Sequence, residues 1–541
     1  MDDARRYLAE GWWRRATVVD DLRRVTSLRP DGIAIAGHRA TTGAVDTVTW
    51  RELSQRVDRF AGALLELGVG RGDVVSLQLP NWWELTALCL ATARIGAVVN
   101  PIIPIFRRRE VEFMLVRTEA RVCVAPAKFR GFSHADMLRD VADAVPTLEH
   151  VVVIGGDGDG DAVDFGAHFV DTAWEATHSP EKLDAMGPDP GDLAQILFTS
   201  GTTGEPKGVM HSHNTLYAAT RAMTDALGLH GDDVVTMGSP MTHQAGYIYC
   251  FLMPLLLGAT AVYQDAWDAD VMLELVEAHG VTFAMGATPF VLDAIAAQRA
   301  RPRDLSTLRY FACGGTPIPP HVVEDAAEVL GTRLFALWGM TENGTVTITR
   351  PEDPDDLAAR SDGRPLPWME CRIVGDDGND VAEGATGMLE VRGASQCLGY
   401  YKRPDLYAAA LDSDGWFDTG DLAHSDGHGG IRIAGRVKDI IIRGGENIPV
   451  VELEGALYRH PAVREVAVVA YPDERLGERA CAIVAPSGDT APTLEDLQSY
   501  LAELGMAKQY WPERVEVVDE LPKTPSGKIQ KYLLRLQLER S

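Results

Sequence analysis

Segments with helical periodicity alternate with short apolar runs near the start of this chain, and this order limits the fold more than any other feature. Between residues 50 and 68, apolar side chains recur three and four positions apart as far as Gly68, and VVSLQLP follows. WWELTALCLATARIG then precedes AVVNPI, and REVEFMLVRTEA precedes RVCVAP. Because parallel strands need a crossover connection that is usually a helix, this order predicts a largely parallel sheet covered by helices.

The chain is too long for a single core. Its 541 residues exceed the roughly 250–300 at which one hydrophobic core usually stops growing. After GRVKDIIIRGG the sequence changes to strand-like runs in EVAVVAYPDERLGERACAIVAP, and then to a helix, TLEDLQSYLAEL, that Thr493 is expected to cap. With the boundary placed at Val437 to Asp439, we predict one domain of residues 1–437 and a small α+β domain of residues 438–541.

The composition is that of an ordinary globular protein, with 46% hydrophobic and 24% charged residues. The formal net charge of -27 argues against a nucleic-acid partner, because a phosphate backbone needs a basic face. If such a protein handles polyanions, we expect it to do so in a locally basic pocket.

The cysteines and the apolar segments favour a cytoplasmic protein. MDDARRYLAE lacks the basic-then-apolar pattern of an export signal. The most apolar run, residues 247–263, is interrupted by Pro254 and Gly258, so it predicts a buried helix followed by a buried strand rather than a transmembrane segment. No Cys-x-x-Cys pair is present, and a reducing compartment is the simpler inference for seven scattered cysteines: Cys89, Cys123, Cys250, Cys313, Cys371, Cys397 and Cys481.

The most informative motif is FTSGTTGEPKGV, residues 198–209, which joins the expected strand end AQILF to a loop of glycines, hydroxyls and one lysine. Glycines let backbone N–H groups approach phosphate oxygens, the hydroxyls donate, and Lys207 adds a positive charge. A Walker-type loop ends in Gly-Lys-Ser/Thr, whereas Lys207 lies between Pro206 and Gly208, so that class is disfavoured. Without its context, the motif could equally be a flexible surface turn.

Five further motifs supply that context. They are CGGTPI (313–318), WGMTE (338–342), WFDTGD (416–421), GRVKDIIIRGGENI (435–448) and PKTPSGKIQK (522–531). Together with the phosphate-loop motif, and in this order, they resemble the signature set of the adenylate-forming superfamily, which includes acyl-CoA synthetases, luciferases and peptide-synthetase adenylation domains. The resemblance covers nearly the whole chain. It implies an α/β fold, with a large N-terminal domain of several subdomains and helix-covered sheets and a small, mobile α+β C-terminal domain.

The resemblance also implies the chemistry. Members of this family join a carboxylate to the α-phosphate of ATP with loss of pyrophosphate, and then exchange AMP for a thiol. Because the two reacting anions repel one another, the site must gather cations and hydrogen-bond donors around the phosphates. ATP, Mg²⁺ and coenzyme A are the expected cofactor and co-substrates, and a small carboxylic acid is the expected partner.

Motif matching assigns the nucleotide site. The resemblance implies that Thr341 contacts the α-phosphate, that Glu342 helps to hold Mg²⁺, and that Trp338, where most relatives have Tyr, stacks on the base. Asp421 is expected to accept hydrogen bonds from the ribose hydroxyls, and Arg436 to approach ribose or phosphate. The residues expected to hold the β- and γ-phosphates are Thr199, Ser200, Thr202, Thr203 and Lys207. Those expected to line the adenine pocket are Gly314, Gly315 and Thr316, and Gly201, Gly204, Gly339 and Met340 complete the nucleotide-binding set.

Lys528 matches the family lysine that reaches from the small domain to the carboxylate and the α-phosphate, and the spacing of the motif favours it over Lys523 and Lys531. Lys438 falls at the family's hinge, so rotation there would withdraw Lys528 and present RGGENI to the site. The residues assigned to CoA are Arg443, Gly444, Gly445 and Glu446. For Arg443, an exposed arginine without a partner is the alternative.

PMTHQAGYIY, residues 240–249, matches the segment that lines the acid pocket, and it contains no aspartate. Adenylation domains for amino acids usually carry one there, so an acid without an amine is expected. His243 would lie beside the carboxylate or the thiol path, with a structural histidine as the alternative. Gly246, Tyr247, Thr288 and Phe290 offer apolar walls. LPNWWE, NPIIPIFR and MGATPF resemble the subgroup of cyclohexanecarboxylate–CoA and medium-chain fatty-acid–CoA ligases, which implies fatty-acid metabolism.

Three other functions stay open at this point. The acyl group could pass to the thiol of a carrier protein instead of free CoA. The chain could be a nucleotide-binding regulator without catalysis, although Lys528, Glu342 and the complete hydroxyl loop argue against that. It could also be a scaffold that uses its acidic surface, although solubility explains the charge more simply. The oligomeric state is open, with a homodimer as one option.

Overall fold

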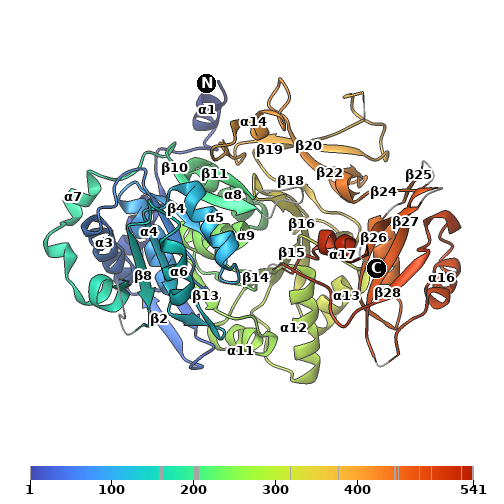
Figure 1. Ribbon diagram of the computed structural model, residues 1–541, viewed down its shortest axis with the longest axis horizontal. Coiled ribbons are helices and arrows are strands. Elements are labelled where there is room, and N and C mark those ends of the chain that lie inside the picture. The colour runs from blue at the N-terminus through green and yellow to red at the C-terminus, as the bar shows by residue number, and fades with distance from the viewer. Residues whose placement is uncertain are drawn as a thin grey trace.

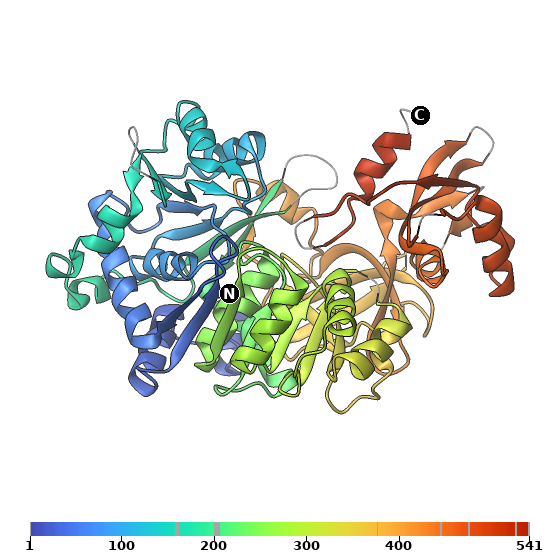
Figure 2. The ribbon, with the colours of Figure 1, turned by 90° about the horizontal axis from the view of Figure 1, so that it is seen from below.

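A computed structural model describes residues 2–156, 162–199, 206–316, 318–375, 377–443, 446–448, 450–473, 476–488, 490–524 and 527–538. The larger part of the chain forms a body of two helix-covered sheets and a smaller antiparallel sheet. The C-terminal part, red in Figures 1 and 2, forms a separate lobe at one end of the long axis.

The first large sheet has nine strands among the described residues, and its central strands are all parallel. Antiparallel strands complete both edges. In sheet order the strands are β18 (Arg364–Pro365), β17 (Gly344–Ile348), β16 (Arg333–Met340), β15 (Tyr310–Gly314), β14 (Phe283–Gly286), β12 (Val234–Met237), β13 (Thr260–Gln264), β1 (Ile33–His38) and β2 (Val45–Thr49). The helices that connect or cover them include α11 (Ala269–His279), α12 (Thr288–Ala300) and α13 (Pro320–Val329).

The second large sheet contains the region where helical and apolar segments alternate in the sequence. Its order is β21 (Gly399–Tyr400), β11 (Lys207–Ser212), β10 (Leu193–Thr199), β4 (Val98–Pro101), β3 (Val74–Leu77), β5 (Val122–Pro126), β8 (His150–Ile154) and β9 (Val163–Asp164). The intervening helices are α3 (Trp50–Glu66), α4 (Trp83–Arg94), α5 (Arg108–Thr118) and α6 (His134–Ala142). The run from β10 to β9 is parallel, so the predicted parallel sheet is confirmed.

Helix α3 shows why the pattern folds in this way. Thr49 caps its first turn in a capping box with Glu52, which satisfies backbone N–H groups that have no partner inside the helix. Trp50, Leu53 and Val57 lie on its buried face at helical spacing. The chain leaves the helix through Gly68, whose φ of 75° is a conformation that glycine adopts without strain.

The apolar run at residues 247–263 forms a buried helix that leads into strand β13, as predicted. The helix is continuous through α9 (Gln244–Gly246), the π-helical segment η3 (Tyr247–Leu252) and α10 (Met253–Leu257). Among the described residues, no helix has both the length and the apolar character needed to cross a membrane. The remaining helical segments before residue 410 are α1 (Asp2–Ala9), α2 (Val18–Leu28), η1 (Gly166–Asp171), η2 (Trp174–Ala176), α7 (Pro180–Asp184), α8 (His213–Leu227), η4 (Leu357–Ala359) and α14 (Pro404–Ala408). Strands β6 (Lys128–Phe129) and β7 (Phe132–Ser133) form a separate antiparallel pair.

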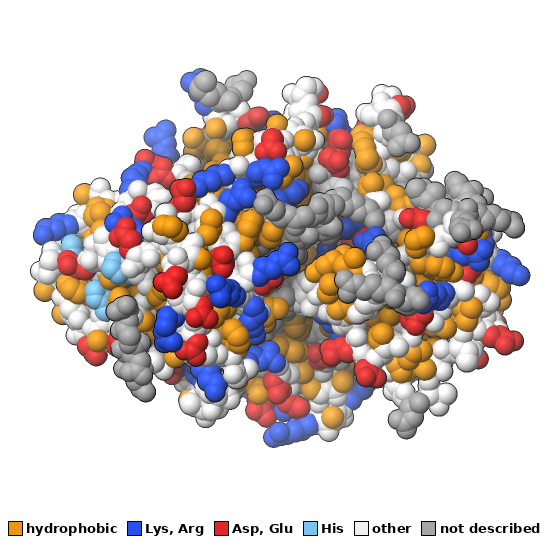
Figure 3. All heavy atoms as spheres, in the orientation of Figure 1, with side chains coloured by type: hydrophobic (Ala, Val, Ile, Leu, Met, Phe, Trp, Pro, Cys, Tyr) orange, Lys and Arg blue, Asp and Glu red, His pale blue; other side chains and the backbone are white. Residues whose placement is uncertain are grey.

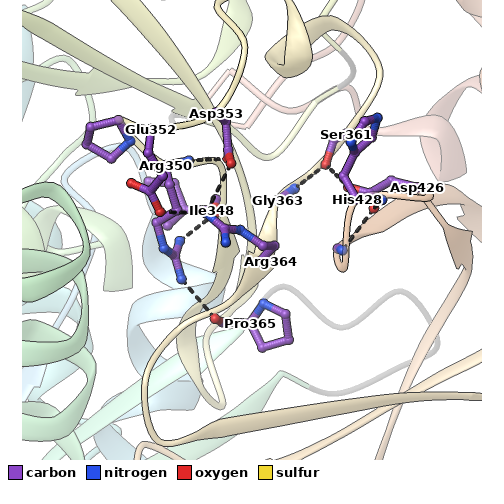
Figure 4. A network of polar contacts seen from close by, with 12 residues as sticks. Ile348, Arg350, Glu352, Asp353, Ser361, Gly363, Arg364, Pro365, Asp426 and His428 are labelled. Atoms are coloured by element: carbon purple, nitrogen blue, oxygen red, sulfur yellow. Dashed lines mark hydrogen bonds and ion pairs between the residues drawn. The ribbon is translucent and has the colours of Figure 1, made fainter.

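A four-stranded antiparallel sheet follows, made of β19 (Met369–Val374), β20 (Gly387–Gly393), β22 (Phe417–Ser425) and β23 (Ile431–Arg436). Figure 4 shows the polar network that joins its β22–β23 turn to the edge of the nine-stranded sheet. The Ser361 hydroxyl donates to Asp426, and its oxygen accepts a 2.8 Å hydrogen bond from the Gly363 N–H. Arg350, which is buried, donates to the carbonyl of Pro365 at 2.8 Å. The network therefore fixes the β22–β23 hairpin against β17 and β18.

Beyond the helical turn η5 (Val437–Asp439), the chain forms the C-terminal lobe around cores of its own. Its sheet contains β25 (Glu446–Ile448), β24 (Ile441–Arg443), β27 (Gly477–Pro486), β26 (Val463–Asp473) and β28 (Arg514–Val517). The helical segments are α15 (Val450–Leu457), α16 (Leu494–Glu503), η6 (Lys508–Tyr510) and α17 (Lys531–Leu538). Thr493 caps α16 as predicted, since its side chain accepts from the Asp496 N–H. The predicted α/β fold, with a large N-terminal domain and a smaller C-terminal one, is confirmed.

Candidate active site

The predicted site segments meet at one edge of the nine-stranded sheet. Strands β12, β14, β15 and β16 are parallel neighbours, and the chain leaves their carboxyl ends in residues 240–246, 287–290, 314–316 and 341–342. Ligands of open α/β sheets bind outside such carboxyl ends. The C-terminal lobe reaches the same edge, because a Cβ placed on Gly527 would lie 3.5 Å from Pro289 and 3.7 Å from Ala287.

Close backbone packing holds the strand ends of this edge. A Cβ on Gly314 would lie 2.5 Å from the carbonyl oxygen of Leu337, and one on Gly339 would lie 2.2 Å from that of Gly344. Neither position has room for a larger residue. The hydroxyl of Thr316 donates a 3.0 Å hydrogen bond to the Thr288 hydroxyl, so the motif expected at the adenine contacts the wall expected for the acid.

Asp421 joins two sequence-distant motifs. Its buried carboxylate accepts a 2.9 Å hydrogen bond from the indole N–H of Trp338 on one oxygen and a 2.8 Å hydrogen bond from Arg436 Nε on the other. Asp421 and Arg436 are also paired across strands β22 and β23. The residues predicted for ribose and base are therefore brought together, and the carboxylate is held by one neutral donor and one charged donor.

Lys207, Tyr400 and Glu342 form a second connected group. The Lys207 ammonium lies 4.7 Å from the centre of the Tyr400 ring, and the Tyr400 hydroxyl donates a 2.8 Å hydrogen bond to Glu342 Oε1. Burial, followed by the charge of Glu342, raises the pKa of the Tyr400 hydroxyl, so it remains a donor. The sequence reasoning missed Tyr400. The available signal was weak, namely that a buried tyrosine usually finds a hydrogen-bond partner.

His211 supports Thr341 and was also missed. Its Nε2 lies 2.8 Å from the Thr341 carbonyl oxygen, and its Nδ1 lies 3.0 Å from the Thr215 hydroxyl. Burial lowers the pKa of the His211 imidazole to about 4, so the ring is neutral at physiological pH. Because a carbonyl only accepts, Nε2 must carry the proton. The imidazole thus fixes the backbone of the residue predicted to contact the α-phosphate.

His243 lies at the start of α9, and its backbone N–H donates to the Pro240 carbonyl at 3.0 Å. Burial, followed by the charge of Lys528, lowers the pKa of the imidazole to about 4. The buried Nδ1 atom makes no hydrogen bond in the part of the chain that the structure describes. The ring is thus neutral, and its buried Nδ1 atom is not used by any described residue.

Lys528 enters this site from the C-terminal lobe. Its backbone N–H donates to the Thr524 hydroxyl at 3.1 Å. The residue is exposed to solvent, although many protein atoms lie around it. The resulting loss of hydration, followed by the positive charge of Arg436, lowers the pKa of the Lys528 ammonium to about 8. Lys523 pairs with Glu465 and Lys531 pairs with Glu454, whereas Lys528 makes no ion pair with any described residue.

The wall predicted for the acid is aromatic and tightly packed. Phe290 meets Trp267 edge to face, with ring centres 4.6 Å apart. A Cβ on Gly238 or on Gly286 would lie 3.0 Å from the Phe290 ring. Tyr247 is buried one turn after His243. A Cβ on Gly246 would lie 2.1 Å from the Pro240 carbonyl oxygen, so this turn also requires glycine.

Some predicted residues are incompletely described. Ser200, Gly201, Thr202, Thr203, Gly204, Gly444 and Gly445 lie outside the described residues, as do the side chains of Lys438 and Glu446. Thr199 ends β10, and the backbone of Lys438 lies in η5. Arg443 donates to both Glu513 oxygens, at 2.7 and 3.2 Å, so the alternative of an arginine without a partner is wrong. Asp439, next to Lys438, pairs with Arg535 at 2.7 Å.

Basic side chains gather locally on the surface, and one carboxylate of the candidate site is suited to a Mg²⁺ ion. Lys and Arg side chains gather over α5 on the face shown in Figure 3, where Arg107, Arg108 and Arg109 are exposed, although the whole chain carries a net charge of -27. The described residues contain no cluster of three or more side chains suited to a metal ion. Mg²⁺ needs only one or two carboxylates together with substrate phosphates. Glu342 is suited to be such a carboxylate ligand, because its Oε2 makes no hydrogen bond with the described residues.

Comparisons with known proteins identify the family. Residues 22–401 match the model of the AMP-binding enzyme, and residues 452–528 match that of the AMP-binding enzyme C-terminal domain. The chain is 35% identical over 535 residues to the medium-chain fatty-acid–CoA ligase of Escherichia coli (strain K12), covering 99% of this chain and 92% of that protein. It is 35% identical over 542 residues to the salicylyl-CoA synthase / salicylate adenylyltransferase of a Streptomyces species, covering 98% of this chain and 95% of that protein.

The solved structure of the anthranilate CoA ligase AuaEII in complex with anthranoyl-AMP superimposes with a TM-score of 0.87 at 26% identity, covering 97% of this chain and 98% of that one. The fold and these matches define the class as ATP-using, adenylate-forming acid ligases. The chain belongs to the AMP-binding enzyme family, and it is an AMP-forming acid–thiol ligase.

Proposed function

We propose that this enzyme is an ATP-dependent carboxylic acid–CoA ligase for a medium-chain or alicyclic acid. The observation that carries the proposal is the position of Lys528. An ammonium without an ion-pair partner among the described residues lies at the carboxyl edge of the sheet, and the charges of Arg436 and Asp421 act on it there. His243, in the segment assigned to the acid, is influenced by the same ammonium.

In the first half-reaction, an oxygen of the acid carboxylate attacks the α-phosphorus of ATP, and the bond to the bridging oxygen of pyrophosphate breaks. Lys528 would stabilise the charge on the carboxylate and the α-phosphate, while Lys207 would hold the outer phosphates. Asp421 and Arg436 would position the ribose. Mg²⁺, held by Glu342, would neutralise phosphate charge.

In the second half-reaction, a thiolate attacks the acyl carbon and AMP leaves. Lys528 has no role in that step, so the C-terminal domain, residues 438–541, would rotate about Lys438 relative to residues 1–437. The rotation would bring strand β24 and its Arg443 toward the site. A separate core in the C-terminal lobe supports movement as a rigid unit.

The proposed acid follows from the pocket wall and the relatives. Phe290, Trp267 and Tyr247 supply apolar surface, and residues 240–249 contain no carboxylate to pair an ammonium. The Escherichia coli relative is named for medium-chain fatty acids, which supports an aliphatic acid. The salicylate and anthranilate relatives make an aryl acid the competing choice within the same pocket.

Transfer to a carrier-protein thiol is the second candidate function. It is favoured by the pairing of Arg443 with Glu513, because a cation already held by a carboxylate is less available to the nucleotide phosphates of CoA. A carrier-bound pantetheine thiol has no nucleotide to recognise.

One experiment separates these functions. Acid-dependent exchange between ATP and pyrophosphate is measured for hexanoate, octanoate, cyclohexanecarboxylate, salicylate, anthranilate, acetate and phenylalanine, and thioester formation is then compared between CoA and a phosphopantetheinyl carrier protein. We expect the highest exchange kcat/KM with the first three acids and thioester formation with CoA. Exchange with acetate or phenylalanine alone would refute the acid class. Transfer to the carrier alone would establish the second candidate, and no exchange with any acid would refute adenylation of these acids.

A further inference from the structure

Tyr400 stands between the two charged groups of opposite sign that the proposed function assigns to the phosphates and to Mg²⁺. The face of its ring is 4.7 Å from Lys207 Nζ, and its hydroxyl donates to Glu342 Oε1 at 2.8 Å. The residue is 3% exposed, so its place is determined by packing. The electron-rich ring face attracts the ammonium, and the hydroxyl satisfies the carboxylate.

The fold rather than local sequence creates this arrangement. Strand β21 pairs antiparallel with β11, so that Tyr400 lies opposite Val209, two residues from Lys207. Glu342 follows the end of β16 in the other large sheet, and its backbone carbonyl accepts a 2.7 Å hydrogen bond from the Cys397 N–H. The segment around Tyr400 therefore contacts both sheets and sets the separation of Lys207 and Glu342.

An ammonium and a carboxylate in the same site would be expected to pair with each other, and each would then be less available to its ligand. A neutral phenol between them attracts both groups and has no net charge. One carboxylate oxygen is occupied by the phenol, and Oε2 makes no hydrogen bond with the described residues. A second group that orients a metal-binding carboxylate in this way usually affects metal affinity strongly.

We propose that Tyr400 is a positioning residue that keeps Lys207 and Glu342 apart, orienting Glu342 for Mg²⁺ through its hydroxyl and Lys207 for the ATP phosphates through its ring. The proposal rests on the proposed function for the identity of the two ligands. It differs from a general packing role, because the hydroxyl and the ring are assigned separate and separable effects.

Two substitutions separate these effects. Tyr400→Phe removes the hydroxyl and keeps the ring, and Tyr400→Leu removes both. Tyr401→Phe is the matched control, since Tyr401 is the next residue and its ring packs against the apolar cluster of the eight-stranded sheet. Circular dichroism and thermal unfolding of each variant establish that it is folded.

Calorimetry then measures binding of ATP to each folded protein, first in EDTA and then across a Mg²⁺ titration, without any acid. For Tyr400→Phe we expect ATP affinity in EDTA within about twofold of wild type, and a Mg²⁺ concentration for half-maximal enhancement raised by about tenfold or more. For Tyr400→Leu we expect weaker ATP binding in EDTA as well. Tyr401→Phe should match wild type in both conditions.

An unchanged Mg²⁺ dependence in Tyr400→Phe would overturn the proposal, as would equal losses in EDTA and in Mg²⁺. If Tyr400→Leu does not fold, the Tyr400→Phe result alone decides the role of the hydroxyl. The binding measurement needs no acid substrate. If the wild-type protein binds MgATP but exchanges pyrophosphate with no acid, the proposed function fails while the inference about Tyr400 is still tested.

Discussion

The indole N–H of Trp338 donates a 2.9 Å hydrogen bond to the carboxylate of Asp421, which lies in a different sheet and 83 residues later in the chain. This bond links the end of strand β16 to the hairpin that also carries Arg436. The hairpin is held at its other end by the Ser361–Asp426 contact (Figure 4). The proposed ribose site is thus fixed from two directions.

Trp338→Phe should therefore destabilise the protein and weaken nucleotide binding. The aromatic ring is kept, but one oxygen of a buried carboxylate loses its donor, and hydrogen bonds to charged groups contribute about 1.5–3 kcal/mol. We expect a loss of about 2 kcal/mol in the free energy of unfolding and a higher Kd for ATP. Denaturant unfolding and calorimetry measure these quantities. Trp267→Phe serves as the comparison for ATP binding, because the Trp267 indole donates to Asp293 instead. Equal ATP affinity in both variants would contradict the role of Trp338.

Much of the fold, but less of the site, could be predicted from the sequence. Helix α3 and strand β3 are determined by local periodicity, capping and glycine placement, so their order along the chain could be predicted from the sequence. Lys528 could be singled out because its motif is local, and its role in the reaction stays a prediction. Tyr400 and His211 were not, because their roles depend on partners brought together by strand pairing between distant segments. No single-residue pattern indicates which buried hydroxyl will meet which carboxylate.

The low pKa of Lys528 could not be predicted from the sequence either, because it arises where the two lobes meet. This pKa has a consequence for the rate of adenylation. A folded-state pKa of about 8 means that the ammonium is half protonated near pH 8, mostly charged at lower pH and mostly neutral at higher pH. Because adenylation would use the charged form, the rate of acid-dependent exchange should fall by about tenfold for each pH unit well above 8. Lys528→Arg, whose guanidinium stays protonated, should remove this decline even if its maximal rate is lower. A decline near pH 8 that persists in Lys528→Arg would assign the titration to another group.

Lys528→Ala should separate the two half-reactions. Removing a cation aimed at the developing charge should lower the adenylation kcat by about 100- to 1,000-fold. Thioester formation from supplied acyl-AMP should change much less, because the proposed rotation would withdraw the lysine from that step. Lys523→Ala is the matched control from the same motif, since Lys523 pairs with Glu465 inside the C-terminal lobe. Equal losses in both half-reactions of Lys528→Ala would mean that the lysine supports the structure rather than the first step.

The pairing of Arg443 with Glu513 leads to a test of the thiol acceptor. If Arg443 exchanges Glu513 for a phosphate of CoA in the second half-reaction, Arg443→Ala should raise the KM for CoA by about tenfold, since hydrogen bonds to charged groups contribute about 1.5–3 kcal/mol. The same variant should leave the KM for pantetheine unchanged, because pantetheine has the thiol arm without the nucleotide. Glu513→Gln frees the guanidinium from a charged partner and should lower the KM for CoA or leave it unchanged. Steady-state kinetics with supplied acyl-AMP measures each value without the first half-reaction. A rise in KM for both thiols in Arg443→Ala would place Arg443 along the pantetheine arm, whereas no rise for either would leave it as a structural partner of Glu513 and would favour the carrier-protein acceptor.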